Sequence, residues 1–475
     1  MKEDPITGQP AAFEEKITRG VGILRGDPRV AIWKLSGPMI VAMLLMAVYN
    51  LADAIWVAGL GPDALAAVGF VAPLFMVLIG LSNGLGAGIT SVVSRRIGAR
   101  DKTGADRAAV HALLIAITVA ILLTVLLVPS IGPIVVLMGG ESVSDLAVEY
   151  GGIVFMGTIF FLAVHCSYAI LRAEGDTRRT MYAMAASSIL NIVLDPILIY
   201  GAGLGVAGAA LATVISVASV AGVLTYWFLG KKDTYVRLSF REFRPERRTI
   251  HDILGVGLPA SIEYLLMSMV VIINNGILVT VAGTDAVAVY TSGWRIVMFA
   301  VVPLIGITTS LVSVAGAAYG AREYVKIRVA LTYSLKIGIT MALVTSVLTY
   351  ILAPQITSLF TYTQESAYLA PAFILFFQTM CLFYPFVPFG MFSSSVFQGT
   401  GHGITSLVIN LLRNLVFIAV FAYLLGVVYG LGELGVYYGI VAGNILGTST
   451  GYIWVSVFLA RLQGSVVEGK TRNQG

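Results

Sequence analysis

The sequence predicts an all-α polytopic membrane protein with twelve membrane-spanning helices in two pseudo-symmetric six-helix bundles. Three observations lead to this prediction: an apolar composition, twelve segments of spanning length, and an internal repeat. The chain is 57% hydrophobic and only 12% charged, whereas a soluble domain is about 25% charged. A chain this apolar would expose large apolar patches in water, so lipid is its expected solvent.

The twelve spans are read from hydropathy, because a spanning helix needs about 20 predominantly apolar residues. The first six are predicted at residues 31–60, 66–92, 108–130, 150–171, 180–200 and 206–229. The second six are predicted at 252–281, 286–316, 329–352, 367–396, 404–428 and 434–460. The long segments 286–316 and 367–396 contain Pro303, Pro385 and Pro388, so we expect kinked helices there.

The basic residues test this topology. With twelve spans and a cytoplasmic N-terminus, 27 of the 30 Lys and Arg residues fall in cytoplasmic segments and none in the loops on the other side. The remaining three (Arg295, Lys336 and Arg413) fall inside spans. This asymmetry supports both the helix number and cytoplasmic N- and C-termini. It also explains the net charge of +5 without nucleic acid as a partner.

An internal repeat divides the chain into two halves. The segment that begins Gly61-Pro62-Asp63 recurs 222 positions later as Gly283-Thr284-Asp285, and Gly98-Ala99-Arg100 recurs at the same offset as Gly320-Ala321-Arg322. Each half has an even number of spans, so both insert the same way up, as in secondary transporters with parallel repeats. The predicted parts are an N-terminal segment (1–30), a first lobe (31–230), a basic linker (231–250), a second lobe (251–460) and a tail (461–475). The charge run of the linker is interpreted as a solvated segment near anionic lipid.

The composition also limits the chemistry. The two cysteines, Cys166 and Cys381, lie inside apolar runs, and the four histidines are scattered. The sequence therefore predicts no disulfide framework, no cysteine metal site and no cofactor. A membrane-embedded transferase would need an acidic metal-binding cluster near a water interface, which the loops lack. We expect a protein that is not an enzyme.

Ionisable groups inside spans are costly and by default mark a functional site. Asp53 shares a helix face with Tyr49, and Asp195 shares one with Asn191, because each pair is four residues apart. Both aspartates lie in the outer third of their spans, and Thr213 of the sixth span lies at a comparable depth. We expect these five residues to form one polar pocket in the first lobe.

Two occupants fit such a pocket. One is a proton, because desolvation and a second nearby carboxylate both favour the protonated form. The other is a hard cation such as Na⁺, held by oxygen atoms of Asp53, Asn191, Asp195 and Thr213. The sequence does not choose between them. A static hydrogen-bond network is the structural alternative.

The second half differs in charge. The position of Asp53 corresponds to Asn274 or Asn275 at the repeat offset, and the half carries Glu263, Arg295 and Arg413 instead. Glu263 is predicted to pair with Arg295 or Arg413, in a structural role or lining a cavity. Lys336 is expected to extend its ammonium group to the membrane surface. Pro38, four turns from Asp53 in the first span, is a predicted hinge.

Several motifs resemble the multidrug and toxic compound extrusion (MATE) family. They are Pro38 with Tyr49-Asn50-Leu51-Ala52-Asp53, the following Gly-Leu-Gly-x-x-Ala-Leu-Ala-Ala (59–67), Arg-Ala-Glu-Gly-Asp-Thr (172–177), and its second-half echo Phe397-Gln398-Gly399-Thr400-Gly401. The similarity covers residues 30 to 460, and the aspartate pair resembles the DinF-like and archaeal branch.

The resemblance implies a V-shaped pair of lobes in the plasma membrane of a prokaryote. It also implies a monomer that exports organic cations or other amphipathic compounds in exchange for H⁺ or Na⁺. It also implies that Asp53 and Asp195 are the coupling carboxylates, with Tyr49, Asn191 and Thr213 around them. Glu263 matches an acidic position on the seventh helix at which some members bind cations. A flippase for lipid-linked or amphipathic molecules is the alternative function, and a channel is a further one.

Overall fold

The computed structural model describes residues 17–231, 233–239, 244–364 and 366–472, with side chains described up to residue 464. Within these ranges every regular element is a helix. The predicted N-terminal segment 1–30 and tail 461–475 lie partly outside the described residues. In the first segment a short helix, α1 (Arg19–Arg25), is described.

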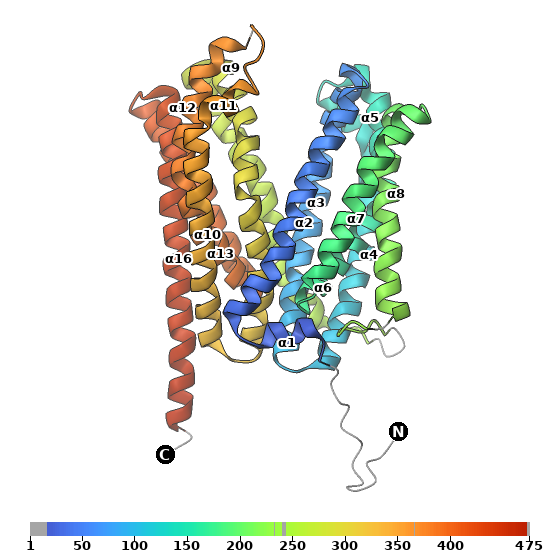
Figure 1. Ribbon diagram of the computed structural model, residues 1–475, viewed down its shortest axis with the longest axis vertical. Coiled ribbons are helices and arrows are strands. Elements are labelled where there is room, and N and C mark those ends of the chain that lie inside the picture. The colour runs from blue at the N-terminus through green and yellow to red at the C-terminus, as the bar shows by residue number, and fades with distance from the viewer. Residues whose placement is uncertain (1–16, 232, 240–243, 365, 473–475) are drawn as a thin grey trace.

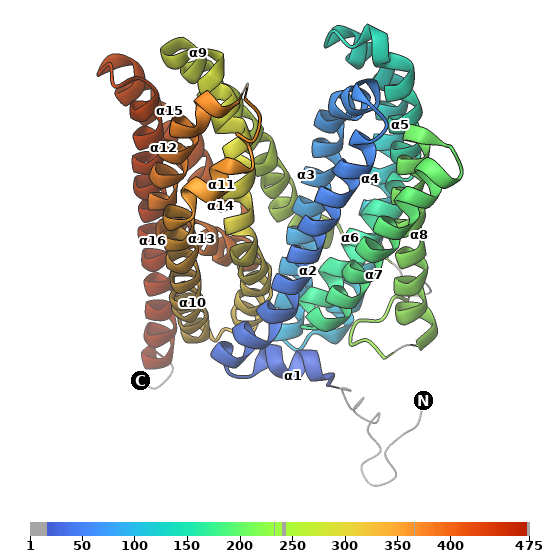
Figure 2. The same ribbon diagram turned by 45° about the horizontal axis from the view of Figure 1, so that its top comes forward.

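The helices form two lobes that diverge from a common base (Figures 1 and 2). The first lobe contains α2 (Pro28–Ala58), α3 (Pro62–Gly98), α4 (Lys102–Leu137), η1 (Glu141–Val143), α5 (Ser144–Met156), α6 (Thr158–Ala173), α7 (Thr177–Pro196), η2 (Ile197–Gly201), α8 (Gly205–Thr225) and η3 (Tyr226–Lys231). The second lobe contains α9 (Arg247–Gly320), α10 (Tyr324–Ile351), α11 (Ala353–Ser358), η4 (Ala367–Leu369), α12 (Ala370–Met380), η5 (Cys381–Phe386), α13 (Val387–Gly399), α14 (Gly403–Leu411), η6 (Leu412–Ile418), α15 (Ala419–Tyr423), η7 (Leu424–Val428) and α16 (Gly432–Arg472).

These elements give the twelve predicted spans. In the described chain ten helices are long and apolar enough to cross a membrane, and α5 with α6 forms one further span bent by 45° at Gly157. The 74-residue helix α9 counts as two spans, because Gly283 interrupts it with φ 79° and ψ −169°. Gly61, its repeat partner, also has a positive φ, 104°. Glycine adopts this conformation without steric cost, so the same turn is built in both halves.

The prolines of the two long segments differ in their effect on helix continuity. Helix α9 continues through Pro303, whereas the predicted span 367–396 is divided into η4, α12, η5 and α13, with Pro385 inside the 3₁₀ segment η5. A 3₁₀ stretch tightens the helix where the proline removes a backbone donor.

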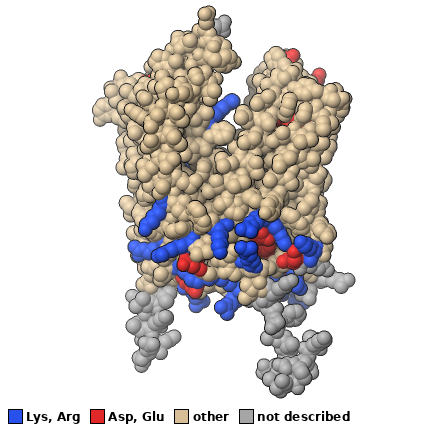
Figure 3. All heavy atoms as spheres, viewed as in Figure 1, with Lys and Arg blue, Asp and Glu red and all other residues tan. Residues whose placement is uncertain are grey.

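The base of the molecule is basic. Figure 3 shows that Lys and Arg side chains gather in a band where the lobes meet, and that the lobes are separated by a hollow at the opposite end. We name these two ends the basic end and the open end. The basic end is the one that the charge pattern predicts to be cytoplasmic.

The lobes meet at the basic end through backbone contacts between α3 and α9. A Cβ atom on Gly98 would lie 1.8 Å from the carbonyl oxygen of Ala317, and one on Gly320 would lie 1.9 Å from that of Arg95. The two contacts are related by the repeat offset of 222 residues. We call these contacts the glycine seam; they bring the backbones closer than any side chain would allow.

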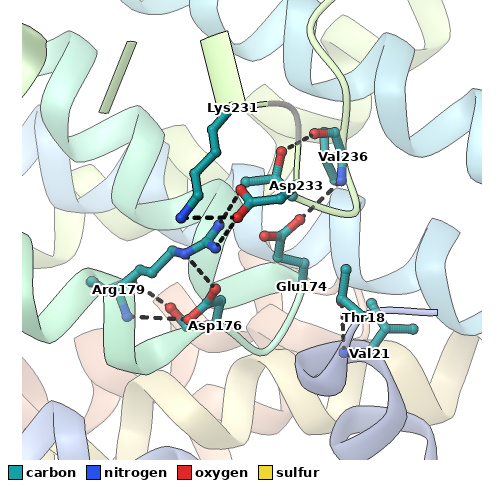
Figure 4. Close-up of polar contacts among 10 residues, drawn as sticks. Thr18, Val21, Glu174, Asp176, Arg179, Lys231, Asp233 and Val236 are labelled. Atoms are coloured by element: carbon teal, nitrogen blue, oxygen red, sulfur yellow. Dashed lines mark hydrogen bonds and ion pairs between the residues drawn. The ribbon is translucent and has the colours of Figure 1, made fainter. Parts of the chain in front are cut away.

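Residues 233–236 of the linker are docked on the first lobe, which corrects the interpretation of this part as a solvated segment. The guanidinium of Arg179 donates two hydrogen bonds to Asp233, of 2.7 and 3.0 Å, and the backbone N–H of Val236 donates to Glu174 at 2.9 Å (Figure 4). Tyr235 and Val236 are buried. The apolar pair and the bidentate ion pair hold this part of the linker, despite its high charge.

Candidate functional site

The first lobe brings the five predicted residues together. Helix α2 carries Tyr49 and Asp53, α7 carries Asn191 and Asp195, and α8 carries Thr213. Helix α2 packs along α7, and α7 packs along α8. The three helices therefore present polar side chains to one another, in the outer part of an otherwise apolar bundle.

Asn191 connects the buried end of the pocket. In the amide orientation that gives both its nitrogen and its oxygen a partner, the nitrogen donates to Asp195 Oδ2 at 3.0 Å, and the oxygen lies 3.2 Å from Thr213 Oγ1. The Tyr49 side chain lies near Thr213 and within electrostatic range of both carboxylates. This arrangement is a connected polar network, and a network is also what the structural alternative predicted.

Each carboxylate nevertheless keeps an unsatisfied oxygen. Oδ1 of Asp53 and Oδ1 of Asp195 are buried and have no hydrogen-bond partner among the described residues. Asp195 is fully buried, and the charge of Asp53 lies within electrostatic range of it. A buried carboxylate oxygen without a donor is costly. A static network would satisfy these atoms, so their state favours a site that receives a proton or a cation.

The sequence reasoning missed Tyr150. This residue of α5 lies within electrostatic range of Asp53, Asp195 and Tyr49. It stands at the predicted edge of the fourth span, in a stretch that includes Glu149, and no spacing links it to the aspartates. Only the packing of α5 against α8 and α3 brings its hydroxyl to the pocket.

The backbone around Asp195 is irregular. Helix α7 ends at Pro196, and the π-helix η2 follows directly. Proline lacks the N–H that an α-helix uses at that position, and π-turns are frequent at functional sites. Pro38 has a different environment: α2 continues through it without a break. Its role as a hinge remains a prediction.

The five polar residues singled out in the second lobe do not form one cluster. Glu263 accepts hydrogen bonds from Ser406 at 2.7 Å and from Gln398 at 3.4 Å, and Arg413 is the basic group in electrostatic range. No ion pair joins Glu263 to Arg295 or to Arg413 within the described chain. Ser406 and Gln398 were not predicted, because uncharged side chains inside a span give little signal in a hydropathy pattern.

Asn274 has another partner. Its amide nitrogen donates to the Tyr290 hydroxyl at 3.2 Å, which joins the two spans of α9. The side-chain oxygens of Asn274 and Asn275 are buried without a hydrogen bond. Arg295, on the second span of α9, is exposed.

A further buried carboxyl lies outside the spans. Glu174 follows the last residue of α6, in the Arg-Ala-Glu-Gly-Asp-Thr motif, and is 1% exposed. Burial raises the pKa of its carboxyl to about 8, although the hydrogen bond from Val236 opposes the shift. The next residues explain the rest of the motif: Gly175 has a φ of 79°, and Asp176 caps α7 by accepting from the N–H of Arg179 at 3.1 Å.

Taken together, the two repeated lobes, the hollow that is open at one end and the buried polar pocket define a membrane transporter. Comparison with known proteins identifies the family. The MatE family matches residues 38–197 and 259–424, so the chain belongs to this family of MATE multidrug efflux transporters. The assignment to the DinF-like and archaeal branch stays a prediction.

Relatives of similar length are known. The multidrug export protein MepA of Staphylococcus aureus (strain MSSA476) is 25% identical over 405 residues, which cover 84% of this chain and 88% of MepA. A solved outward-facing conformation of a multidrug resistance MATE family transporter is 43% identical, with a TM-score of 0.92 over 95% of this chain and 100% of that one. A MOP superfamily transporter from Pyrococcus furiosus Vc1, for which reversed polarity of the binding pocket suggests a different function, is 42% identical, with a TM-score of 0.92 over 94% and 100% of the two chains.

Proposed function

We propose that the protein is a secondary active antiporter that exports organic cations or other amphipathic compounds in exchange for H⁺ or Na⁺. The pocket of Asp53 and Asp195 is the coupling site of this proposal. The observation that carries it is the pair of buried carboxylate oxygens without hydrogen-bond partners. Such atoms gain most from a bound proton or cation.

Both ions suit the donor set. A proton needs one of the two carboxylates. Na⁺ needs several oxygens, and the pocket offers two carboxylates, the Asn191 amide, the Thr213 hydroxyl and the Tyr49 hydroxyl. The amide of Asn191 would turn its oxygen toward the ion in that case, and it would give up the hydrogen bond to Asp195.

The direction of opening follows from charge. If the basic end is cytoplasmic, the hollow at the open end faces outward, as it does in the outward-facing relative. Exchange then requires that the ion and the exported compound differ in their affinity for the outward- and inward-open states. Ion binding between α2 and α7 changes the packing of α2, the helix that contains Pro38 and contacts both lobes.

Transport in liposomes tests the proposal. The purified protein is reconstituted, and efflux of an ethidium-like cation is followed under an imposed Na⁺ gradient or pH gradient, each alone. We expect one gradient to drive efflux, and we expect Asp53→Asn and Asp195→Asn each to abolish the coupled transport. Asp63→Asn, at the exposed start of α3, is the matched control and should transport normally. Coupled transport retained in both pocket variants would contradict the proposed site.

The flippase alternative is tested in the same liposomes with a fluorescent lipid analogue in one leaflet. Gradient-dependent movement of the lipid without movement of the cation would replace the antiporter proposal.

A further inference from the structure

Arg295 is a cationic side chain inside a membrane span. Arg295 has no hydrogen bond and no ion pair with any described residue, and its side chain is exposed. A charged residue inside a span normally faces a partner or a water-filled cavity. The surroundings of Arg295 decide which of these applies.

Arg295 lies deep in the half of the molecule that contains the hollow. It follows the turn at Gly283 by twelve residues, which corresponds to roughly 18 Å of helix. The other two basic residues of the spans, Lys336 and Arg413, lie nearer in sequence to the basic-end starts of their helices, at Tyr324 and Gly403. Figure 3 shows a Lys or Arg side chain between the two lobes, well above the basic band.

The helix face around Arg295 is only partly apolar. The opposite face of the second span of α9 is buried in the second lobe through Val289, Tyr290, Gly293 and Val297. The face that carries Arg295 exposes Thr291 one turn before it, Ala288 two turns before it and Phe299 one turn after it. By contrast, α10 exposes large apolar residues, namely Val344, Val347, Leu348 and Ile351, as a lipid-facing helix does.

The neighbouring helix packing fixes the position of this face. Trp294 stacks on Phe383 of η5 with ring centroids 6.2 Å apart, and Tyr290 contacts Phe376 of α12 edge to face at 6.0 Å. These aromatic contacts hold the second span of α9 against the lobe. Gly306, eleven residues or about three turns further along the face of Arg295, contacts Ile40 of α2 in the first lobe. The face that carries the guanidinium is therefore turned toward the first lobe, across the hollow.

The repeat shows that the charge is not required by the fold. At the offset of 222 residues Arg295 corresponds to Pro73, and Thr291 corresponds to Gly69, both exposed on α3. The same face of the first lobe is thus uncharged. A structural need of this helix would have been met in both halves.

From these observations we propose that Arg295 is a substrate-binding residue of the hollow, and that it recognises a carboxylate, phosphate or sulfonate group on an amphipathic molecule. A guanidinium presents planar donors that match such groups in a bidentate arrangement. The transported compounds then include zwitterions and amphipathic anions as well as simple organic cations. This inference rests on the proposed function as an exporter, and it names a substrate class for the hollow.

A matched pair of dyes tests the proposal. Rhodamine B carries a cationic ring system and a free carboxylate, whereas its ethyl ester has the same rings without the negative charge. Binding of each dye to the full chain, in nanodiscs of zwitterionic lipid and without any gradient, is measured by fluorescence anisotropy. We compare the wild type with Arg295→Gln, Arg295→Lys and the control Lys336→Gln, which removes a basic group from an exposed position on α10.

Arg295→Gln should weaken the binding of rhodamine B by about tenfold or more, which corresponds to a lost charge-assisted hydrogen bond. The affinity for the ester should change less than twofold, Arg295→Lys should be intermediate, and Lys336→Gln should match the wild type. Equal losses for both dyes, or wild-type affinity for rhodamine B in Arg295→Gln, would overturn the proposal. Thermal unfolding in detergent verifies that the variants fold. If Arg295→Gln does not fold, the conservative Arg295→Lys variant still tests the proposal.

The source of the anionic group is distinguished by adding anionic lipid to the nanodiscs. If anionic lipid competes with rhodamine B in the wild type but not in Arg295→Gln, the site also binds a lipid head group. If anionic lipid does not compete, the site binds the anionic group of the free compound alone. Because no gradient is applied, loss of the proposed coupling at Asp53 and Asp195 would leave this binding result unchanged, and the reverse also holds.

Discussion

The glycine seam predicts that a single methyl group shifts the balance between the two states of the transporter. In Gly98→Ala the new Cβ atom would lie 1.8 Å from the carbonyl oxygen of Ala317, whereas ordinary contact begins at 3.4 Å. Helices α3 and α9 must therefore separate locally by the difference, 3.4 − 1.8, or about 1.6 Å. The obstacle is backbone, so it cannot turn aside as a side chain would.

The cost can be estimated from core overpacking, which destabilises proteins by about 1–3 kcal/mol. The inward-open state requires that the lobes part at the basic end, so this cost applies to the outward-open state and is relieved in the other. The ratio of outward- to inward-open molecules should then fall by roughly 5- to 150-fold. The gain in helix propensity from alanine, about 0.5–1 kcal/mol, is equal in both states and cancels.

Pulsed EPR measures the shift. Spin labels are placed at the open end of each lobe, at Glu141 of η1 and at Tyr362 in the loop after α11, after replacement of the buried Cys166 and Cys381. Gly98→Ala should move the distance distribution toward shorter values, and Gly320→Ala should do the same because its contact is the repeat partner. Gly222→Ala, where a Cβ would meet nothing within 4 Å, is the control. Wild-type distributions in both seam variants would refute the reasoning.

Three further predictions concern other parts of the chain. Glu174 holds its proton more tightly in the folded state than in the unfolded state. Its stabilising contribution is therefore complete below pH 4 and is lost as the pH rises toward 8, by at most about 1.4 kcal/mol per pH unit. Glu174→Gln should reduce the dependence of the melting temperature on pH between pH 5 and 9, and an unchanged slope would contradict this. Tyr150→Phe should weaken coupling-ion affinity a few-fold in liposome transport without lowering the melting temperature, whereas equal loss of both would assign Tyr150 to packing alone. Arg100 and Arg322 both have a φ of 60°, a conformation that costs a non-glycine residue about 1–2 kcal/mol. Arg100→Gly should therefore raise the free energy of unfolding by up to about 1 kcal/mol, measured by chemical unfolding. A loss of stability would show that the contacts of the Arg100 side chain contribute more than the backbone strain costs.

Hydropathy predicted the spans because membrane insertion depends on it, and the internal repeat predicted the two lobes. The twelve spans, the two-lobed arrangement and the equivalent turns at Gly61 and Gly283 all follow from segment length and from the offset of 222 residues. Local irregularity could not be predicted in the same way. The π-helix η2 does not change the apolar composition of its span, so hydropathy could not reveal it. The interruption of the tenth span at η5 was indicated only by the prolines in that span.

The site was predictable only where charge and helical spacing coincide. Asp53 with Tyr49 and Asp195 with Asn191 are visible as pairs four residues apart, and the structure brings both pairs together. Tyr150 and Glu174 gave no comparable signal, because what defines each is a partner far away in the sequence. The partner of Glu174 is the N–H of Val236, 62 residues away. Because nearly every residue has a backbone N–H, the sequence does not indicate which one is the partner.

The docked linker moves the boundary between the two halves of the chain. Asp233 and Val236 attach the first part of the linker to Arg179 and Glu174 of the first lobe. Glu246, directly before α9, donates a backbone hydrogen bond of 2.9 Å to His111 of the same lobe. The first lobe as a folding unit therefore ends near residue 246. A transporter produced as two separate polypeptides should be divided between Glu246 and Arg247, because a division after η3 would remove from the first fragment the segment that covers its own buried carboxyl.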